Sequence, residues 1–153
     1  MNTTLEKPST VSANIVLPLM SGGLLLPNAS VAEIVLAGQL SSAVSSPFLL
    51  GYMAWREQEI PIISFEGLLN GRLPEGLVLR QMAVFNGLSD RQKMPYFGVA
   101  LSGVPRLVRL RESDITPLDT DPHPLLHSQV RAVELKLMIP NWDALEQEVL
   151  AVL

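Results

Sequence analysis

Residues 47–65 read PFLLGYMAWREQEIPIISF, and this stretch decides the fold. It predicts one short helical turn followed by a β-hairpin. Ser46 can cap a helix start, Pro47 suits the first helical position, and Gly51 can end the helix in a left-handed conformation. Two β-prone runs then flank a polar turn at residues 56–59, which is typical of a hairpin. This apolar unit carries a tryptophan and an arginine but no catalytic group, so it predicts a surface for partner proteins.

The length of 153 residues indicates one globular domain or two small subdomains that share a core, and the composition excludes several functions. Hydrophobic residues make up 48% and charged residues 17%, and the net charge of -4 leaves no basic surface for nucleic acid. The absence of cysteine excludes disulfides and thiolate metal sites, and agrees with a cytoplasmic location. Prolines and glycines interrupt both long uncharged spans, 8–32 and 34–55, so we expect no transmembrane helix and no signal peptide.

The remaining segments predict a mainly β, barrel-like domain that ends in a helix. The polar residues 1–13 predict a disordered lead-in, which places the domain at residues 14–153. Strands are expected at 15–20, 24–26, 31–36, 77–85, 96–101, 107–110 and 133–137. Loops are expected at 37–46, 68–76, 86–94 and 119–124. Apolar residues three to four apart from Trp142 to Val152, with Asn141 as cap, predict the helix.

Two charges stand out in the apolar first third of the chain. Glu33 is the only charged residue between residues 8 and 55, and Arg56 is the next positive one. A carboxylate in an apolar strand needs a partner, so we expect an ion pair across neighbouring strands that fixes the hairpin register. The alternative is that both side chains reach solvent separately. Trp55 is either a core residue or a surface anchor, whereas Trp142 is expected in the core.

No catalytic or metal motif is convincing. His123 and His127 are four residues apart, which suits two metal ligands on a helix, but prolines on both sides of His123 predict a solvated loop. The segment 119–121 reads DTD but lacks the glycine of an aspartic-protease turn. No nucleophile elbow and no phosphate-binding glycine loop is present in the sequence. We therefore expect no enzymatic activity, cofactor or metal; a small β-barrel enzyme or an unrelated SH3-like protein-binding module is the alternative.

The order and spacing of several short motifs resemble those of CheW-like coupling domains of bacterial chemosensory systems. The motifs are VAEI (31–34), PFLLG (47–51), AWR (54–56), IPIIS (60–64), VFN (84–86) and FGVALSGV (97–104). The resemblance implies two SH3-like five-stranded β-barrels that share a hydrophobic core and have no catalytic activity. Such domains couple the cytoplasmic tip of methyl-accepting chemoreceptors to the regulatory domain of a CheA-like histidine kinase.

The resemblance also assigns residues to interaction or to the structural motif: Val31, Glu33, Pro47, Gly51, Trp55, Arg56 and Pro61. It implies that Val31 lies in the receptor-contacting region and that Glu33 and Arg56 are the family's paired charges. The chain departs from the family pattern at three positions. Glu57 replaces a turn glycine, Ser102 replaces an aspartate, and Trp55 replaces a smaller apolar residue. Among subfamilies, the chain most resembles coupling proteins of pilus-linked systems, the ChpC or PilI type.

Overall fold

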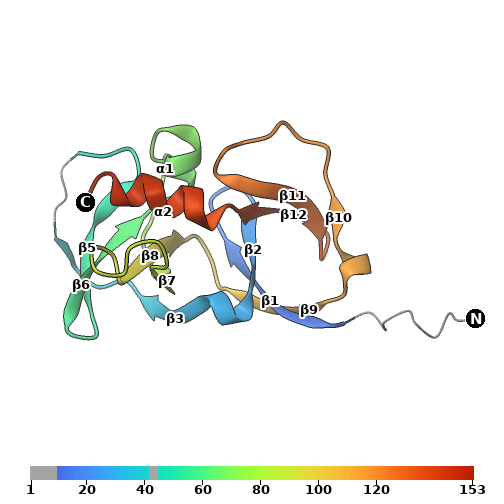
Figure 1. The fold of residues 1–153 in the computed structure, drawn as a ribbon, viewed down its shortest axis with the longest axis horizontal. Helices are drawn as coiled ribbons and strands as arrows, with labels where there is room; N and C mark the ends of the chain where they lie inside the picture. The colour runs from blue at the N-terminus through green and yellow to red at the C-terminus, as the bar shows by residue number, and fades with distance from the viewer. Residues whose placement is uncertain (1–9, 42–44) are drawn as a thin grey trace, which may run out of the picture.

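The computed structural model describes residues 10–41 and 45–153, and these residues form two β-barrel subdomains that lie side by side (Figure 1). Subdomain A contains the sheet β10-β11-β12-β2-β1-β9, and subdomain B contains the sheet β3-β7-β8-β6-β5-β4. Each sheet has five longer strands and one two-residue strand at an edge, β10 or β4. The expected mainly β fold is therefore confirmed.

Strands of subdomain A come from both ends of the chain, whereas those of subdomain B form one continuous stretch. Subdomain A contains β1 (Ser12–Pro18), β2 (Gly23–Pro27), β9 (Arg106–Leu110), β10 (Thr116–Pro117), β11 (Leu126–Ala132) and β12 (Leu135–Pro140). Subdomain B contains β3 (Val31–Leu36), β4 (Leu40–Ser41), β5 (Leu49–Trp55), β6 (Gln58–Ile63), β7 (Gln81–Asn86), β8 (Tyr96–Leu101) and the short helix α1 (Phe65–Asn70). The C-terminal helix is α2 (Trp142–Leu150).

The chain passes between the subdomains three times. It leaves subdomain A after β2, builds the whole of subdomain B, and returns to subdomain A at β9. After β12 it crosses again as α2, which lies against subdomain B (Figure 1). Trp142 at the start of α2 stacks edge-on against Phe85 and Phe97 of subdomain B, with centroid distances of 4.9 and 5.9 Å. The predicted helix and its Asn141 cap are confirmed, since the Asn141 side chain accepts a hydrogen bond from the Ala144 N–H.

Alternate residues of the inner strands face different hydrophobic clusters. In β1, Ile15 and Leu17 join a central cluster shared by both subdomains, whereas Val16 points into the interior of subdomain A. In β6, Ile63 joins the central cluster and Ile62 points into the interior of subdomain B. These strands are buried on both faces, which explains their continuous apolar sequences. The shared hydrophobic core is therefore present.

The predicted hairpin at the centre of the chain is confirmed, but its turn is shorter than the expected residues 56–59 because Gln58 and Glu59 belong to β6. Strands β5 and β6 pair in antiparallel register with Trp55 opposite Gln58, so the turn consists of Arg56 and Glu57 alone. Both have positive φ, 47° and 65°, as a two-residue type I′ turn requires. Glu57 therefore adopts a conformation that glycine, the residue implied here by the resemblance, takes more easily.

The predicted helical turn at residues 47–51 is wrong. The Ser46 hydroxyl does accept hydrogen bonds from the N–H groups of Phe48 and Leu49, as a cap would. The chain nevertheless continues as strand β5, because the backbone from Leu49 onward pairs with β6 instead of closing helical hydrogen bonds. Gly51 lies in this strand with φ 148°, at the register shift between Leu49 and Gly51. A side chain at Gly51 would overlap the Ser41 carbonyl, so this glycine shapes a β-bulge.

Four other expectations need correction. The predicted loop 68–76 begins inside α1, which is capped by the Ser64 hydroxyl and ends at the left-handed Gly71. The predicted loop 37–46 contains β4. The predicted strand 77–85 begins later, because residues 77–80 lie before β7. Val133 lies in a second positive-φ turn before β12, at φ 46°, instead of in the strand.

The start of the domain differs slightly from the expectation. Residues 1–9 of the predicted lead-in lie outside the described residues. Strand β1 begins at Ser12, two residues before the predicted domain start and three before the predicted strand, and it ends at Pro18 instead of residue 20. Ser12 and Ala13 pair with Leu110 and Arg109 of β9.

Candidate protein-interaction site

Three of the predicted site residues form one cluster at the tip of the β5–β6 hairpin. The Arg56 guanidinium lies 3.1 Å from Oε1 of Glu33, which is on β3. The same oxygen accepts a hydrogen bond from the indole N–H of Trp55 at 3.1 Å. The guanidinium carbon also lies 4.4 Å from the Trp55 ring centroid, within cation–π range. The expected Glu33–Arg56 pair therefore exists, and Trp55 joins it.

The environment of this pair differs from the expectation in two ways. The pair is solvent-exposed, with 62% of the Arg56 side chain and 43% of the Glu33 side chain accessible. The two strands are also not neighbours, because β7, β8 and β6 lie between β3 and β5 in the sheet order. The ion pair therefore connects strands from opposite parts of the curled sheet and does not set the register of a single hairpin.

Trp55 is a core residue, as one of the two sequence interpretations holds. Its side chain is buried in the interior cluster of subdomain B. It stacks edge-on against Tyr96 at a centroid distance of 4.7 Å. Only its indole N–H is directed to Glu33. Val31, the other predicted site residue on β3, is half-buried against the central cluster, and its backbone pairs with Phe85 of β7.

The remaining predicted site residues are not part of this cluster. Pro47 is exposed, and its carbonyl packs so closely on α1 that a side chain at Gly67 would overlap it. Gly51 is the bulge residue of β5. Pro61 is buried in β6, opposite Tyr52 of β5. All three lie where they shape the backbone of β5, β6 and α1.

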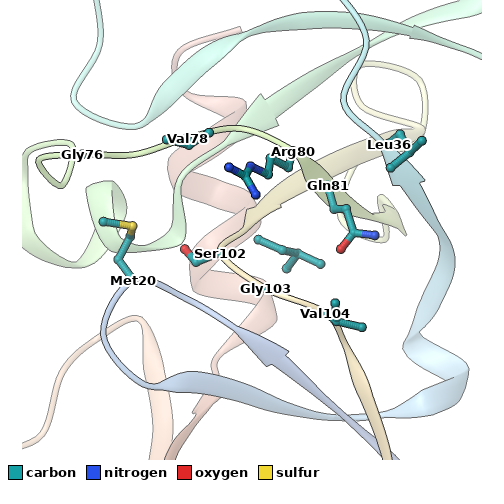
Figure 2. Close-up of a pocket in the computed structure, with 10 residues that line it drawn as sticks. Met20, Leu36, Gly76, Val78, Arg80, Gln81, Ser102, Gly103 and Val104 are labelled. Atoms are coloured by element: carbon teal, nitrogen blue, oxygen red, sulfur yellow. The ribbon is translucent and has the colours of Figure 1, made fainter.

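A groove of about 470 Å³ that the sequence did not indicate lies where the two subdomains meet. Four chain segments surround it: the β1–β2 turn, the end of β3, residues 76–81 and the segment after β8 (Figure 2). Its apolar side chains include Met20, Leu36, Val78 and Val104, all solvent-exposed. No periodicity could have revealed it, because these residues come from turns and strand ends far apart in the sequence.

The polar residues of the groove come from the same segments. Arg80, Gln81 and Ser102 line it (Figure 2). An exposed apolar surface with a polar rim is typical of a protein-interaction site. The groove and the Glu33–Arg56 cluster both involve β3, with Leu36 at its last position.

The side chains of the two histidines contact backbone or serine groups. The segment 119–124 is irregular, as predicted, but His123 is half-buried: its Nδ1 accepts a hydrogen bond from the Leu125 N–H, and its Nε2 lies 3.1 Å from the Leu69 carbonyl of α1. His127 is exposed beside Ser128. Across residues 10–41 and 45–153, no three metal-ligating side chains gather in one place.

Similarity to known proteins extends along nearly the whole domain. The family model of the CheW-like domain matches residues 16–146. The chain belongs to the CheW-like domain family. This match spans both subdomains and the start of α2, so the short motifs between residues 31 and 104 reflect a relationship along the full length of the domain. The CheW-like domain is a non-enzymatic scaffold domain of chemosensory signalling.

The CheW-like fold is also found by structural comparison. The crystal structure of the scaffolding protein TtCheW from Thermoanaerobacter tengcongensis superposes with a TM-score of 0.68. The two chains are 17% identical, and the match covers 86% of this chain and 90% of the other. No curated protein matches this CheW-like chain in a sequence comparison. Within the described ranges, neither helix has the length and apolar character needed to cross a membrane.

Proposed function

We propose that this CheW-like chain is a non-enzymatic cytoplasmic adaptor that couples chemoreceptors to a CheA-like histidine kinase. The family match over residues 16–146 carries the proposal, because it covers both barrels of the domain. The exposed apolar groove supports it independently, since an adaptor needs surfaces that a partner can cover. The resemblance to ChpC and PilI favours a pathway that controls type IV pili.

The groove between the subdomains suits the helical tip of a receptor. Its apolar side chains come from four segments. Two of these side chains, Leu36 and Val104, are 76% and 78% exposed. Amphipathic helices bind by laying an apolar face into such a groove. Arg80 at the rim would favour a helix that carries an acidic residue beside its apolar face. Val31, the position that the resemblance assigns to receptor contact, lies on the same strand as Leu36.

The regulatory domain of the kinase would bind elsewhere, through an apolar surface at a barrel end. We expect a transient contact of at most about 1,600 Å² with micromolar affinity. Its salt dependence should be weak because only 17% of the residues are charged, which leaves few charges to steer association.

The test uses the receptor tip fragment and the kinase regulatory domain encoded in the same gene cluster. Surface plasmon resonance measures the binding of each to the wild-type chain, Val104→Glu, Leu36→Glu and the control Leu88→Glu. Leu88 is exposed but does not line the groove. We expect both groove variants to lose receptor binding and keep kinase binding, with little change in thermal stability, and the control to retain receptor binding. If neither partner binds at tens of micromolar, the adaptor proposal is wrong.

A further inference from the structure

Two buried glutamates each bind the backbone of a connecting segment through hydrogen bonds. Glu66 on α1 is 6% exposed and Glu146 on α2 is 1% exposed. Each accepts hydrogen bonds from two successive backbone N–H groups: Met20 and Ser21 for Glu66, Leu88 and Ser89 for Glu146. In the part of the chain that the structure describes, neither carboxylate has an ion-pair partner. Backbone donors therefore compensate the burial of both charges.

Glu66 uses both of its carboxylate oxygens. Oε1 accepts from the Met20 N–H at 2.9 Å, and Oε2 accepts from the Ser21 N–H and the Ser21 hydroxyl, each at 2.9 Å. The two oxygens thus fix the orientation of two consecutive peptide groups. Met20 and Ser21 belong to the β1–β2 connection of subdomain A, whereas Glu66 belongs to subdomain B. These hydrogen bonds therefore join the two subdomains.

Met20 forms one wall of the groove between the subdomains (Figure 2). The side chain is exposed, and a methionine side chain has three rotatable bonds, so its place depends on the backbone that carries it. That backbone is bound to Glu66. We propose that Glu66 is a positioning residue for the groove: it fixes the Met20 wall and so preforms the surface on which a receptor helix docks. This inference rests on the proposed function.

Glu146 provides a matched control because it builds the same kind of contact away from the groove. Only one of its two carboxylate oxygens, Oε1, is used: it accepts hydrogen bonds from the N–H groups of Leu88 and Ser89, at 2.8 and 3.0 Å. A glutamine at position 146 can keep both bonds through its one carbonyl oxygen. A glutamine at position 66 cannot, because its amide nitrogen would face one of the two N–H groups. The same substitution should therefore have different effects at the two sites.

Amide hydrogen exchange followed by NMR tests the contact without any partner. In Glu66→Gln, we expect the amide of Met20 or Ser21 to exchange at least about tenfold faster, since a hydrogen bond to a charged acceptor is lost. The Met20 methyl resonance should shift and sharpen. In Glu146→Gln, the amides of Met20 and Ser21 and the Met20 methyl signal should remain as in the wild type. Unchanged exchange and an unchanged Met20 methyl signal in a folded Glu66→Gln variant would overturn the proposal.

Binding of the receptor tip fragment completes the test. Glu66→Gln should bind it several-fold more weakly than Glu146→Gln does; equal affinities would overturn the proposal. If the wild-type chain does not bind the fragment, the receptor part of the proposed function fails, whereas the exchange and methyl data still decide the role of Glu66. If Glu66→Gln does not fold, Glu66→Asp replaces it, because it keeps the charge but is one methylene too short to reach both N–H groups. We expect faster amide exchange at Met20 or Ser21 in this variant, and unchanged exchange at both would refute the role of Glu66.

Discussion

Removing the Glu33–Arg56 ion pair should destabilise the protein only slightly. Two unit charges 3.1 Å apart attract each other by about 1.3 kcal/mol in the dielectric of water. Ordering two long side chains offsets part of this attraction, and both are largely exposed, so the net coupling should be about 0.5 to 1 kcal/mol. Arg56→Ala also loses the contact with the Trp55 ring, and its total loss should be about 1 kcal/mol.

Substitutions of Glu33 separate the ion pair from the indole contact. Glu33→Ala should cost more than Arg56→Ala, about 2 kcal/mol, because it leaves the N–H of the buried Trp55 without its acceptor. Glu33→Gln keeps an acceptor and should lose only the ion-pair part. The double variant Glu33→Ala/Arg56→Ala should lose less than the sum of the single variants.

Urea unfolding at two salt concentrations measures these free energies. The coupling energy should fall at high salt, since exposed charges are screened. A loss of about 3 kcal/mol or more for Arg56→Ala, insensitive to salt, would show that the pair behaves as a buried one and would refute this reasoning. Strictly additive losses would show that the two side chains act independently.

Three further outcomes are expected, two from local backbone geometry and one from the proposed adaptor function. Gly51→Ala should destabilise by about 2 kcal/mol or more in urea unfolding, since φ is 148° and the new methyl would meet the Ser41 carbonyl. The matched change Gly71→Ala, at φ 75° in open space, should cost only about 1 kcal/mol; equal losses would exclude a steric role for Ser41. Glu57→Gly should stabilise the protein by about 0.5 kcal/mol and so raise its thermal midpoint. A lower midpoint would contradict the turn assignment. Isothermal calorimetry with ATP or Zn²⁺ should show no stoichiometric binding, and a stoichiometric site for either would contradict the adaptor function.

The hairpin and its neighbours could be predicted because local patterns determined them. The turn at Arg56 and Glu57 follows from two β-prone runs on both sides of a polar segment. The bounds of β3 and β8 match the predicted 31–36 and 96–101, since each is a largely apolar segment bounded by polar residues or turns. The wrong prediction at residues 47–51 came from strand pairing that the local sequence does not show. Ser46 offers a helix cap, yet pairing with β6 makes Leu49 onward a strand.

The candidate site was only partly predictable. Charge scarcity identified Glu33 and Arg56 as partners, but the order of strands in the sheet is not encoded in either segment, so the exposed position of the pair was missed. Helix α1 was missed because its Ser64 cap directly follows a strand and Gly67 lowers its helix propensity. The groove and the role of Glu66 depend on contacts between residues about 45 apart in the chain.

The three chain crossings between the subdomains restrict how the two barrels can move relative to one another. A domain pair joined by one linker can rotate about that linker as a hinge. In this chain the connections after β2, after β8 and after β12 tether the barrels at three separate places, and one hydrophobic cluster fills the space between them. Rotation of one barrel about any one of these connections would have to displace the other two and open the shared cluster, so the connections and the cluster oppose clamp-like opening. In the proposed adaptor function, a receptor would therefore displace this chain as one body, and a kinase attached to it would be translated and tilted with it.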